Sequence, residues 1–136
     1  MTAFGSRKVH VPLCARGVAL FTWKQLIDSS LGASDYLAIS RAFHTVMLSG
    51  VPRMSIAQSH LARRFITCVD TLYERRCKLI LLADGQPNEL FPNEKEAQGA
   101  SQEEVFAFQR TVSRLIEMQS VLYLEQPHRS DHVETK

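Results

Sequence analysis

The sequence has 136 residues, of which 45% are hydrophobic and 22% are charged, as in ordinary globular proteins. A chain of this length can bury one hydrophobic core and corresponds to one domain. Its longest apolar runs are far too short to cross a bilayer, so we expect no integral membrane segment. The net charge of +2 gives no general reason to expect nucleic acid or an anionic membrane as a partner.

The cysteine content indicates a reducing compartment. Cys14, Cys68 and Cys77 are an odd set without a Cys-x-x-Cys pair, which argues against a disulfide framework and against secretion. The first acidic residue is Asp28, so residues 1–24 superficially resemble an acid-poor import presequence. The strand-like alternation within them favours a folded segment over a cleaved one.

The first predicted elements are two short strands, Arg7–Val11 and Val18–Trp23, separated by Pro12 and Gly17. Their composition favours a hairpin or two edge strands. A short helix is expected over 24–30. A second helix follows over 35–43, with Ser34 as its cap and Asp35 in its first turn.

The middle of the chain predicts a parallel βαβ unit. Residues 44–52 form an apolar strand, and Ser55 and Gln58 have the spacing of a helix-capping box. The helix that follows has one apolar face, formed by Leu61, Phe65, Cys68, Val69, Leu72 and Tyr73. Cys77–Ala83 is apolar almost throughout, which is typical of a strand buried on both faces. A helical crossover between two such strands requires them to be parallel.

The C-terminal third predicts a polar loop over 84–104, an amphipathic helix over 104–124 and a disordered tail over 125–136. The inward positions expected on this helix are Val105, Phe108, Val112, Leu115, Ile116 and Leu122. The fold class is therefore α/β: a small three-layer-like domain over 5–124 with a parallel βαβ unit, an N-terminal strand pair and a C-terminal helix.

The sequence contains no phosphate-binding loop of the GxxxxGK[ST] type, because its six glycines are scattered at positions 5, 17, 32, 50, 85 and 99. The tip of the strand over 44–52 carries Ser49 and Gly50, where a magnesium-binding ATPase needs an acidic residue. We therefore do not expect this chain alone to hydrolyse ATP.

Other chemistry is weakly indicated. His128 and His132 have a spacing seen in metal sites but lie in the expected tail, so we predict no metal site. Cys77 lies beside three basic residues, which could lower the pKa of its thiol. Residues 53–78 contain six basic and two acidic residues. That excess suits either a solvated helix face or phosphate-backbone binding, and no RNA-binding signature accompanies it.

The C-terminal helix places Arg110 and Arg114 one turn apart, where two like charges repel. This spacing predicts an acidic or phosphate partner. Arg114 could pair with Glu117, and Arg110 with an acidic residue elsewhere in the domain.

Four segments together resemble the C-terminal part of the ZapE family of AAA+-like P-loop ATPases, which includes the lactation-elevated mitochondrial ATPase of animals. They are "LGASDYLAIS" (31–40), "FHTVMLSGVPRM" (43–54), "ARRFITCVDTLYERRCKLILLA" (62–83) and "FAFQRTVSRLIEMQS" (106–120). The chain departs from the family pattern at 27–33, where a Cys-x-x-Pro-Leu-Gly-Ala run is usual, and at Leu82, where a small polar residue is common.

The resemblance implies a ring-forming ATPase of protein quality control that uses ATP and Mg²⁺, with other ATPase subunits and protein substrates as partners. It implies a mitochondrial location in a eukaryote and a cytoplasmic one in a bacterium. The family's Walker A motif, magnesium-binding acids and first sensor lie upstream of the matching region. We therefore expect a truncated gene model, a fragment or a product that has lost the ATPase core, and we expect it to bind neither ATP nor Mg²⁺ alone.

In ATPase rings, arginines outside the P-loop stabilise charge on the γ-phosphate, within a subunit or across an interface. The resemblance makes Arg110 and Arg114, and secondarily Arg63 and Arg64, candidates for this role. Two main functions remain open at this point: part of an ATP-hydrolysing machine, or a stand-alone module that docks on full-length ATPase subunits. Phosphate-backbone binding through residues 53–78 is a third.

Overall fold

A four-stranded sheet organises the chain in the computed structural model, which describes residues 2–4, 8–93 and 97–129. Its strand order is β3 (Leu13–Ala15), β4 (Val18–Thr22), β5 (Thr45–Val51) and β6 (Lys78–Ala83). The first pair is antiparallel, whereas β4, β5 and β6 are parallel. The predicted α/β class and the parallel unit over 44–83 are confirmed.

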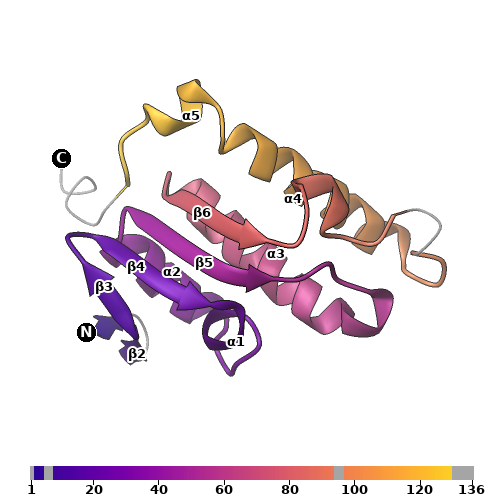
Figure 1. The fold of residues 1–136 in the computed structure, drawn as a ribbon, viewed down its shortest axis with the longest axis horizontal. Coiled ribbons are helices and arrows are strands. Elements are labelled where there is room, and N and C mark those ends of the chain that lie inside the picture. The colour runs from indigo at the N-terminus through magenta and orange to yellow at the C-terminus, as the bar shows by residue number, and fades with distance from the viewer. Residues whose placement is uncertain (1, 5–7, 94–96, 130–136) are drawn as a thin grey trace.

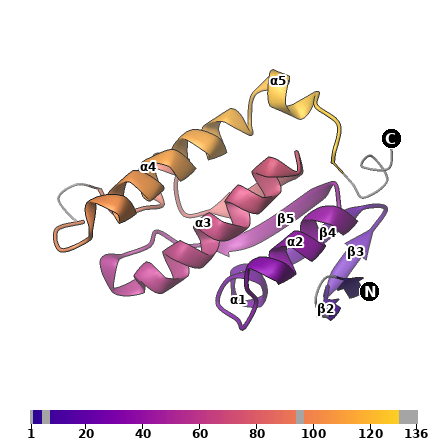
Figure 2. The same ribbon diagram turned by 180° about the vertical axis from the view of Figure 1, so that it is seen from behind.

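The parallel strands are joined by two helical crossovers that share β5. The first contains α1 (Trp23–Leu26) and α2 (Ala33–Ala42), and the second contains the 3-10 turn η1 (Ile56–Gln58) and α3 (Ser59–Glu74). Sequence reasoning predicted only the second as a βαβ unit. Because such crossovers have one hand and the strands follow in chain order, α2 and α3 lie on the same face of the sheet, as Figures 1 and 2 show.

Two hairpins form the N-terminal region. β1 (Thr2–Phe4) pairs with β2 (Lys8–His10), and both lie beside α2. The two predicted strand segments therefore do not pair with each other, since each has a neighbour that was not predicted. The second hairpin turns at Arg16 and Gly17, whose φ angles of 52° and 80° match the left-handed turn that a two-residue hairpin needs.

The core lies between the sheet and the helical layer. The predicted apolar face of α3 is buried, apart from the half-buried Tyr73. A row of aromatic rings runs through this core, with centroid separations of 5.3 Å from Trp23 to Phe65, 5.9 Å from Phe65 to Phe91, and 5.3 Å from Phe91 to Phe108. These contacts tie the N-terminal crossover, α3 and the C-terminal helix into one body.

The predicted C-terminal helix is in fact two helices. The 3-10 turn η2 (Pro87–Glu89) follows β6, then α4 (Gln102–Glu117) packs beside α3, and a turn leads to α5 (Val121–Leu124). The Ser120 hydroxyl accepts a hydrogen bond from the backbone N–H of Tyr123, so it caps α5 and redirects the chain. The expected inward positions Ile116 and Leu122 are wrong, since both are exposed: Leu122 lies beyond the break at Ser120, and Ile116 lies on the solvent side of α4.

The start of the predicted tail has defined contacts. The ring Nε2 of His128 lies 2.5 Å from the carbonyl oxygen of Ser40, and the backbone N–H of Arg129 donates to the carbonyl of Arg75. Residues 130–136, like Arg7 in the first predicted strand, lie outside the described part of the chain. In that part, no helix is long and apolar enough to cross a membrane.

The burial of β6 differs from the prediction. This strand lies at the edge of the sheet, and its side chains alternate between the two faces. Leu79 and Leu81 are partly buried on the helical side, whereas Ile80 is 47% exposed and Leu82 is 63% exposed on the other side. A sequence typical of a strand buried on both faces is covered on one face only.

Candidate functional site

Asp70 is the partner of both arginines on α4. Asp70 lies in the C-terminal third of α3, and its carboxylate accepts hydrogen bonds from Arg114 Nη1 at 2.6 Å and from Arg110 Nη2 at 3.2 Å. One acidic group thus offsets the repulsion between two arginines spaced one turn apart. This ion pair links α3 to α4 and gives both arginines a structural role.

Tyr73 extends the same contact by one turn. The Arg114 guanidinium lies 4.8 Å from the centroid of the Tyr73 ring, a cation–π geometry. The Tyr73 hydroxyl donates to the Glu117 carboxylate at 2.9 Å. Glu117, the partner expected for Arg114, therefore binds Tyr73, and the acid that Arg114 does bind lies 44 residues earlier in the chain.

The other two candidate arginines are on α3 and differ in their contacts. Arg64 is half-buried, and its Nη1 donates to the carbonyl of Ser29 at 2.5 Å and to that of Ile27 at 3.2 Å. It satisfies carbonyl groups of the loop after α1. Arg63 is exposed, and its guanidinium has no hydrogen-bond or ion-pair partner among the described residues. Of the four candidates, Arg63 is the one whose charge is available to a ligand or another molecule.

The loop between β5 and α3 joins a parallel strand to a helix, which is the local context that a phosphate-binding loop requires. Here Pro52-Arg53-Met54-Ser55 contains neither glycine nor lysine, so it has no backbone suited to cradling phosphates. Arg53 Nε instead donates to the carbonyl of Asp84 at 3.0 Å, and its Nη2 lies 3.4 Å from Glu89. The described residues also form no group of three or more metal-ligating side chains. These residues do not fit a MgATP site.

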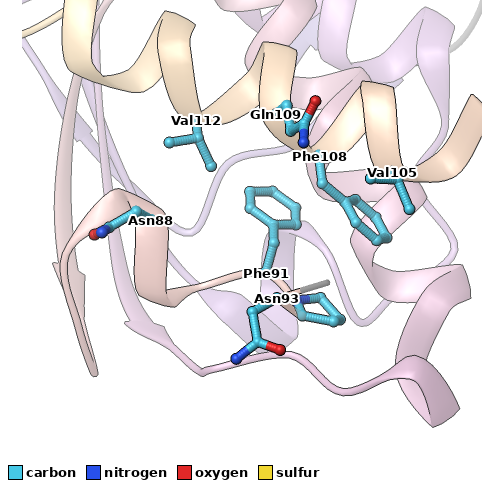
Figure 3. A pocket seen from close by; sticks show the side chains of 8 residues that line it. Asn88, Phe91, Asn93, Val105, Phe108, Gln109 and Val112 are labelled. Atoms are coloured by element: carbon cyan, nitrogen blue, oxygen red, sulfur yellow. The ribbon is translucent and has the colours of Figure 1, made fainter. Parts of the chain in front are cut away.

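A groove of about 360 Å³ lies between the η2 segment and α4 (Figure 3). Its floor is apolar, with the stacked rings of Phe91 and Phe108. Asn88, Asn93 and Gln109 add amide groups at its margin, so the groove can accept an apolar group with flanking hydrogen bonds. The burial of Phe91 was not predicted, because residues 84–104 were interpreted as a polar loop. The apolar run Leu90-Phe91-Pro92 was the local signal that could have indicated it.

Cys77 is not an activated thiol. Burial raises its pKa to about 12, and this outweighs the lowering effect of Arg75 and Lys78. Its Sγ lies 3.3 Å from the carbonyl oxygen of Ser40 and 3.4 Å from that of Phe43. The lowered pKa that its basic neighbours suggested is therefore wrong, since burial raises the pKa instead.

Comparison with known proteins decides the family. The model of the family described as AFG1-like ATPase matches residues 2–127. The chain belongs to the AFG1-like ATPase family. It is 40% identical over 123 residues to the cell division protein ZapE of Escherichia coli K12, covering 88% of this chain and 31% of that protein.

Two further relatives are eukaryotic. The chain is 33% identical over 141 residues to the lactation elevated protein 1 homolog B of Danio rerio, covering 86% of this chain and 28% of that protein. It is also 33% identical over 141 residues to an uncharacterized protein of Schizosaccharomyces pombe, covering 89% of this chain and 31% of that one. The chain thus spans about a third of the length of these relatives. No solved structure matches it.

Proposed function

We propose that this chain serves ATP hydrolysis by an AFG1-like ATPase without holding the nucleotide itself, and that Arg63 is the residue it offers to the phosphates. The family model over residues 2–127 supports the link to ATP hydrolysis. The loop before α3, which lacks glycine and lysine, supports a nucleotide held by residues outside this chain.

The observation that carries the role of Arg63 is its lack of a partner. A guanidinium without a partner can approach a γ-phosphate without first breaking an ion pair or a hydrogen bond. Arg110 and Arg114 bind Asp70, and Arg64 binds two carbonyls. Arg63 stands exposed on α3, and the same placement allows it to act across a subunit interface.

The finer features of this function rest on family resemblance. ATP and Mg²⁺ would be bound by residues that the family carries outside the matched segment. The partners would be ATPase subunits of a ring and protein substrates under quality control, in mitochondria for a eukaryotic protein or in the cytoplasm for a bacterial one.

A chimera tests the role of Arg63. This chain would replace the matched segment of Escherichia coli ZapE, and ATP turnover would be compared for Arg63→Ala, Arg63→Lys and Arg110→Ala in a chimera that hydrolyses ATP. We expect Arg63→Ala to lower turnover at least about 100-fold, because arginines of this kind contribute that much or more. Arg110→Ala is the matched control, and we expect it to retain turnover. Undiminished turnover in a folded Arg63→Ala protein would exclude the role.

A second function is favoured by the apolar surface on the open side of the sheet. A module that docks on an AFG1-like ATPase needs such a surface, and Leu13 and Leu82 are 64% and 63% exposed there. Both functions require contact with an ATPase of this family, and they differ in whether Arg63 matters for turnover.

A further inference from the structure

A row of apolar side chains crosses the face of the sheet opposite α2 and α3. Leu13 is in register with Leu20, Leu20 with Met47, and Met47 with Ile80, so the row spans all four strands. Leu82 lies one position further along β6 on the same face. We call these five residues the open face. They line a groove of about 360 Å³ together with residues of β4 and β5.

The open face does not have the composition of a surface that contacts water. Antiparallel sheets with one solvated face alternate apolar and polar residues, and the outer positions carry charge. Here the positions flanking the row are Thr22 and Ser49 on one side, and Val18 and Thr45 on the other. Among the described strands β3 to β6, Lys78 at the start of β6 is the one charged residue, and it lies on the same side of the sheet as the open face. Four of the five apolar side chains are between 37% and 64% exposed.

Parallel strands normally have helices on both faces, because their crossovers place helices there and because the strands are apolar on both sides. In this chain both crossovers use the same face, as Figure 2 shows, and Figure 1 shows the other face with no helix in front of β4 and β5. The sequence of β6, Leu79-Ile80-Leu81-Leu82, is that of a strand covered on both sides. The sequence pattern therefore predicts a second helical layer on this side of the sheet, and the described residues do not form one.

We propose that the open face is a docking surface for an amphipathic helical layer of an AFG1-like ATPase, formed by the part of the ATPase that lies outside the segment this chain matches. That segment is 31% of Escherichia coli ZapE, so the larger part of the relative is available to supply the layer. The proposal rests on the family membership that also underlies the proposed function. It adds the surface on which the two parts meet.

A helical occupant fits this surface better than a second copy of the chain. Two copies would have to join sheet to sheet, a packing typical of antiparallel sandwiches. The groove between β3–β4 and β6 suits a ridge of side chains from a helix. The scarcity of charge around the open face matches an apolar helix face, and Lys78 alone would offer an ion pair to a polar partner.

Cysteine labelling tests the proposal. In the 136-residue chain, Ile80→Cys and the matched polar control Glu103→Cys would be exposed to N-ethylmaleimide, and modified peptides would be quantified by mass spectrometry. Cysteines at the two aligned positions of intact Escherichia coli ZapE would be treated identically. Cys68 and Cys77 are both buried, so their lack of reaction shows that a variant is folded. If Ile80→Cys does not fold, Leu82→Cys replaces it.

In the chain alone we expect Ile80→Cys to react within about threefold of Glu103→Cys, since both positions are exposed. In intact ZapE we expect the position aligned with Ile80 to react at least about tenfold more slowly than its control. Equal reactivity of both positions in ZapE would overturn the proposal. Slow labelling of Ile80→Cys in the chain alone would also overturn it. If the labelling slows further as the protein concentration rises, the open face contacts a second copy of the chain. ATP turnover is not measured, so this result is independent of the role of Arg63.

Discussion

At the scale of single residues, the repulsion between the two arginines of α4 is offset by an acidic residue that is distant in the sequence. The spacing of Arg110 and Arg114 indicates that an acidic group is needed, and Asp70 is that group. Nothing in the local sequence selects Asp70 over the other acids, because the two helices meet only in the folded chain. The same contacts distinguish Arg63, which sequence reasoning ranked below Arg110 and Arg114.

Thr111 gives a first prediction, on stability. It is fully buried on α4, and its Oγ1 has no hydrogen-bond partner among the described residues. Replacing it with valine keeps the shape and removes a desolvated hydroxyl, so we expect Thr111→Val to raise the free energy of unfolding by about 1 kcal/mol. Urea denaturation measures this. Thr71→Val is the control, and we expect it not to raise the free energy of unfolding, because the Thr71 hydroxyl donates to the carbonyl of Thr67 at 2.8 Å. A clear loss of stability in Thr111→Val would contradict the burial of an unpaired hydroxyl.

Buried titratable groups give a second prediction, on pH. Burial raises the pKa of Cys77 to about 12, and burial also raises the pKa values of Cys68, Tyr36 and Tyr123 above their ordinary ranges. Between the ordinary thiol pKa of about 8.5 and these raised values, the unfolded chain binds fewer protons than the folded one. The free energy of unfolding therefore falls as pH rises above about 9.

Thermal unfolding between pH 8 and 11 measures this loss. We expect the melting temperature to fall steadily above pH 9, and to fall less steeply in Cys77→Ala, which lacks one of the titrating groups. A melting temperature that stays constant up to pH 11 would show that these groups are not protected from solvent in the folded chain.

At the scale of elements, the contact between α3 and α4 depends on Asp70. We expect Asp70→Ala to lower the free energy of unfolding by about 1–2 kcal/mol, because it removes two charge-assisted hydrogen bonds and leaves two arginines in repulsion. A double-mutant cycle in urea would separate the pairs. The coupling should be larger with Arg114, whose side chain is 26% exposed, than with Arg110, which is 48% exposed and more screened by solvent. Equal and negligible couplings would contradict the ion pair as a link between the helices.

Several elements could be predicted because their signals are local. The spacing of apolar residues over 61–73 fixed α3, and the apolar runs over 44–52 and 77–83 fixed β5 and β6. The break at Ser120 was missed, although serine is a favoured cap and its hydroxyl does cap α5. The β1–β2 and β3–β4 pairings depend on which strands meet in space, so composition alone left them open.

At the scale of the whole molecule, the chain is a one-sided sheet with a helical layer and an apolar open face. The sequence of β6 indicated burial on both sides, and that indication was wrong for the chain as it folds alone. It becomes consistent if the open face packs against another part of an AFG1-like ATPase. The periodicity of a sequence does not show which other part of a protein covers a surface. An apolar strand with one exposed face indicates that such a covering part exists.

The measurement that most directly tests the central claim is titration of this chain with MgATP by isothermal calorimetry. In the proposed function the nucleotide is bound by residues outside the chain, because the β5–α3 loop lacks the glycines and lysine of a phosphate-binding loop. We therefore expect no binding heat at millimolar MgATP. Saturable, stoichiometric binding with a dissociation constant of about 1 mM or below would contradict it.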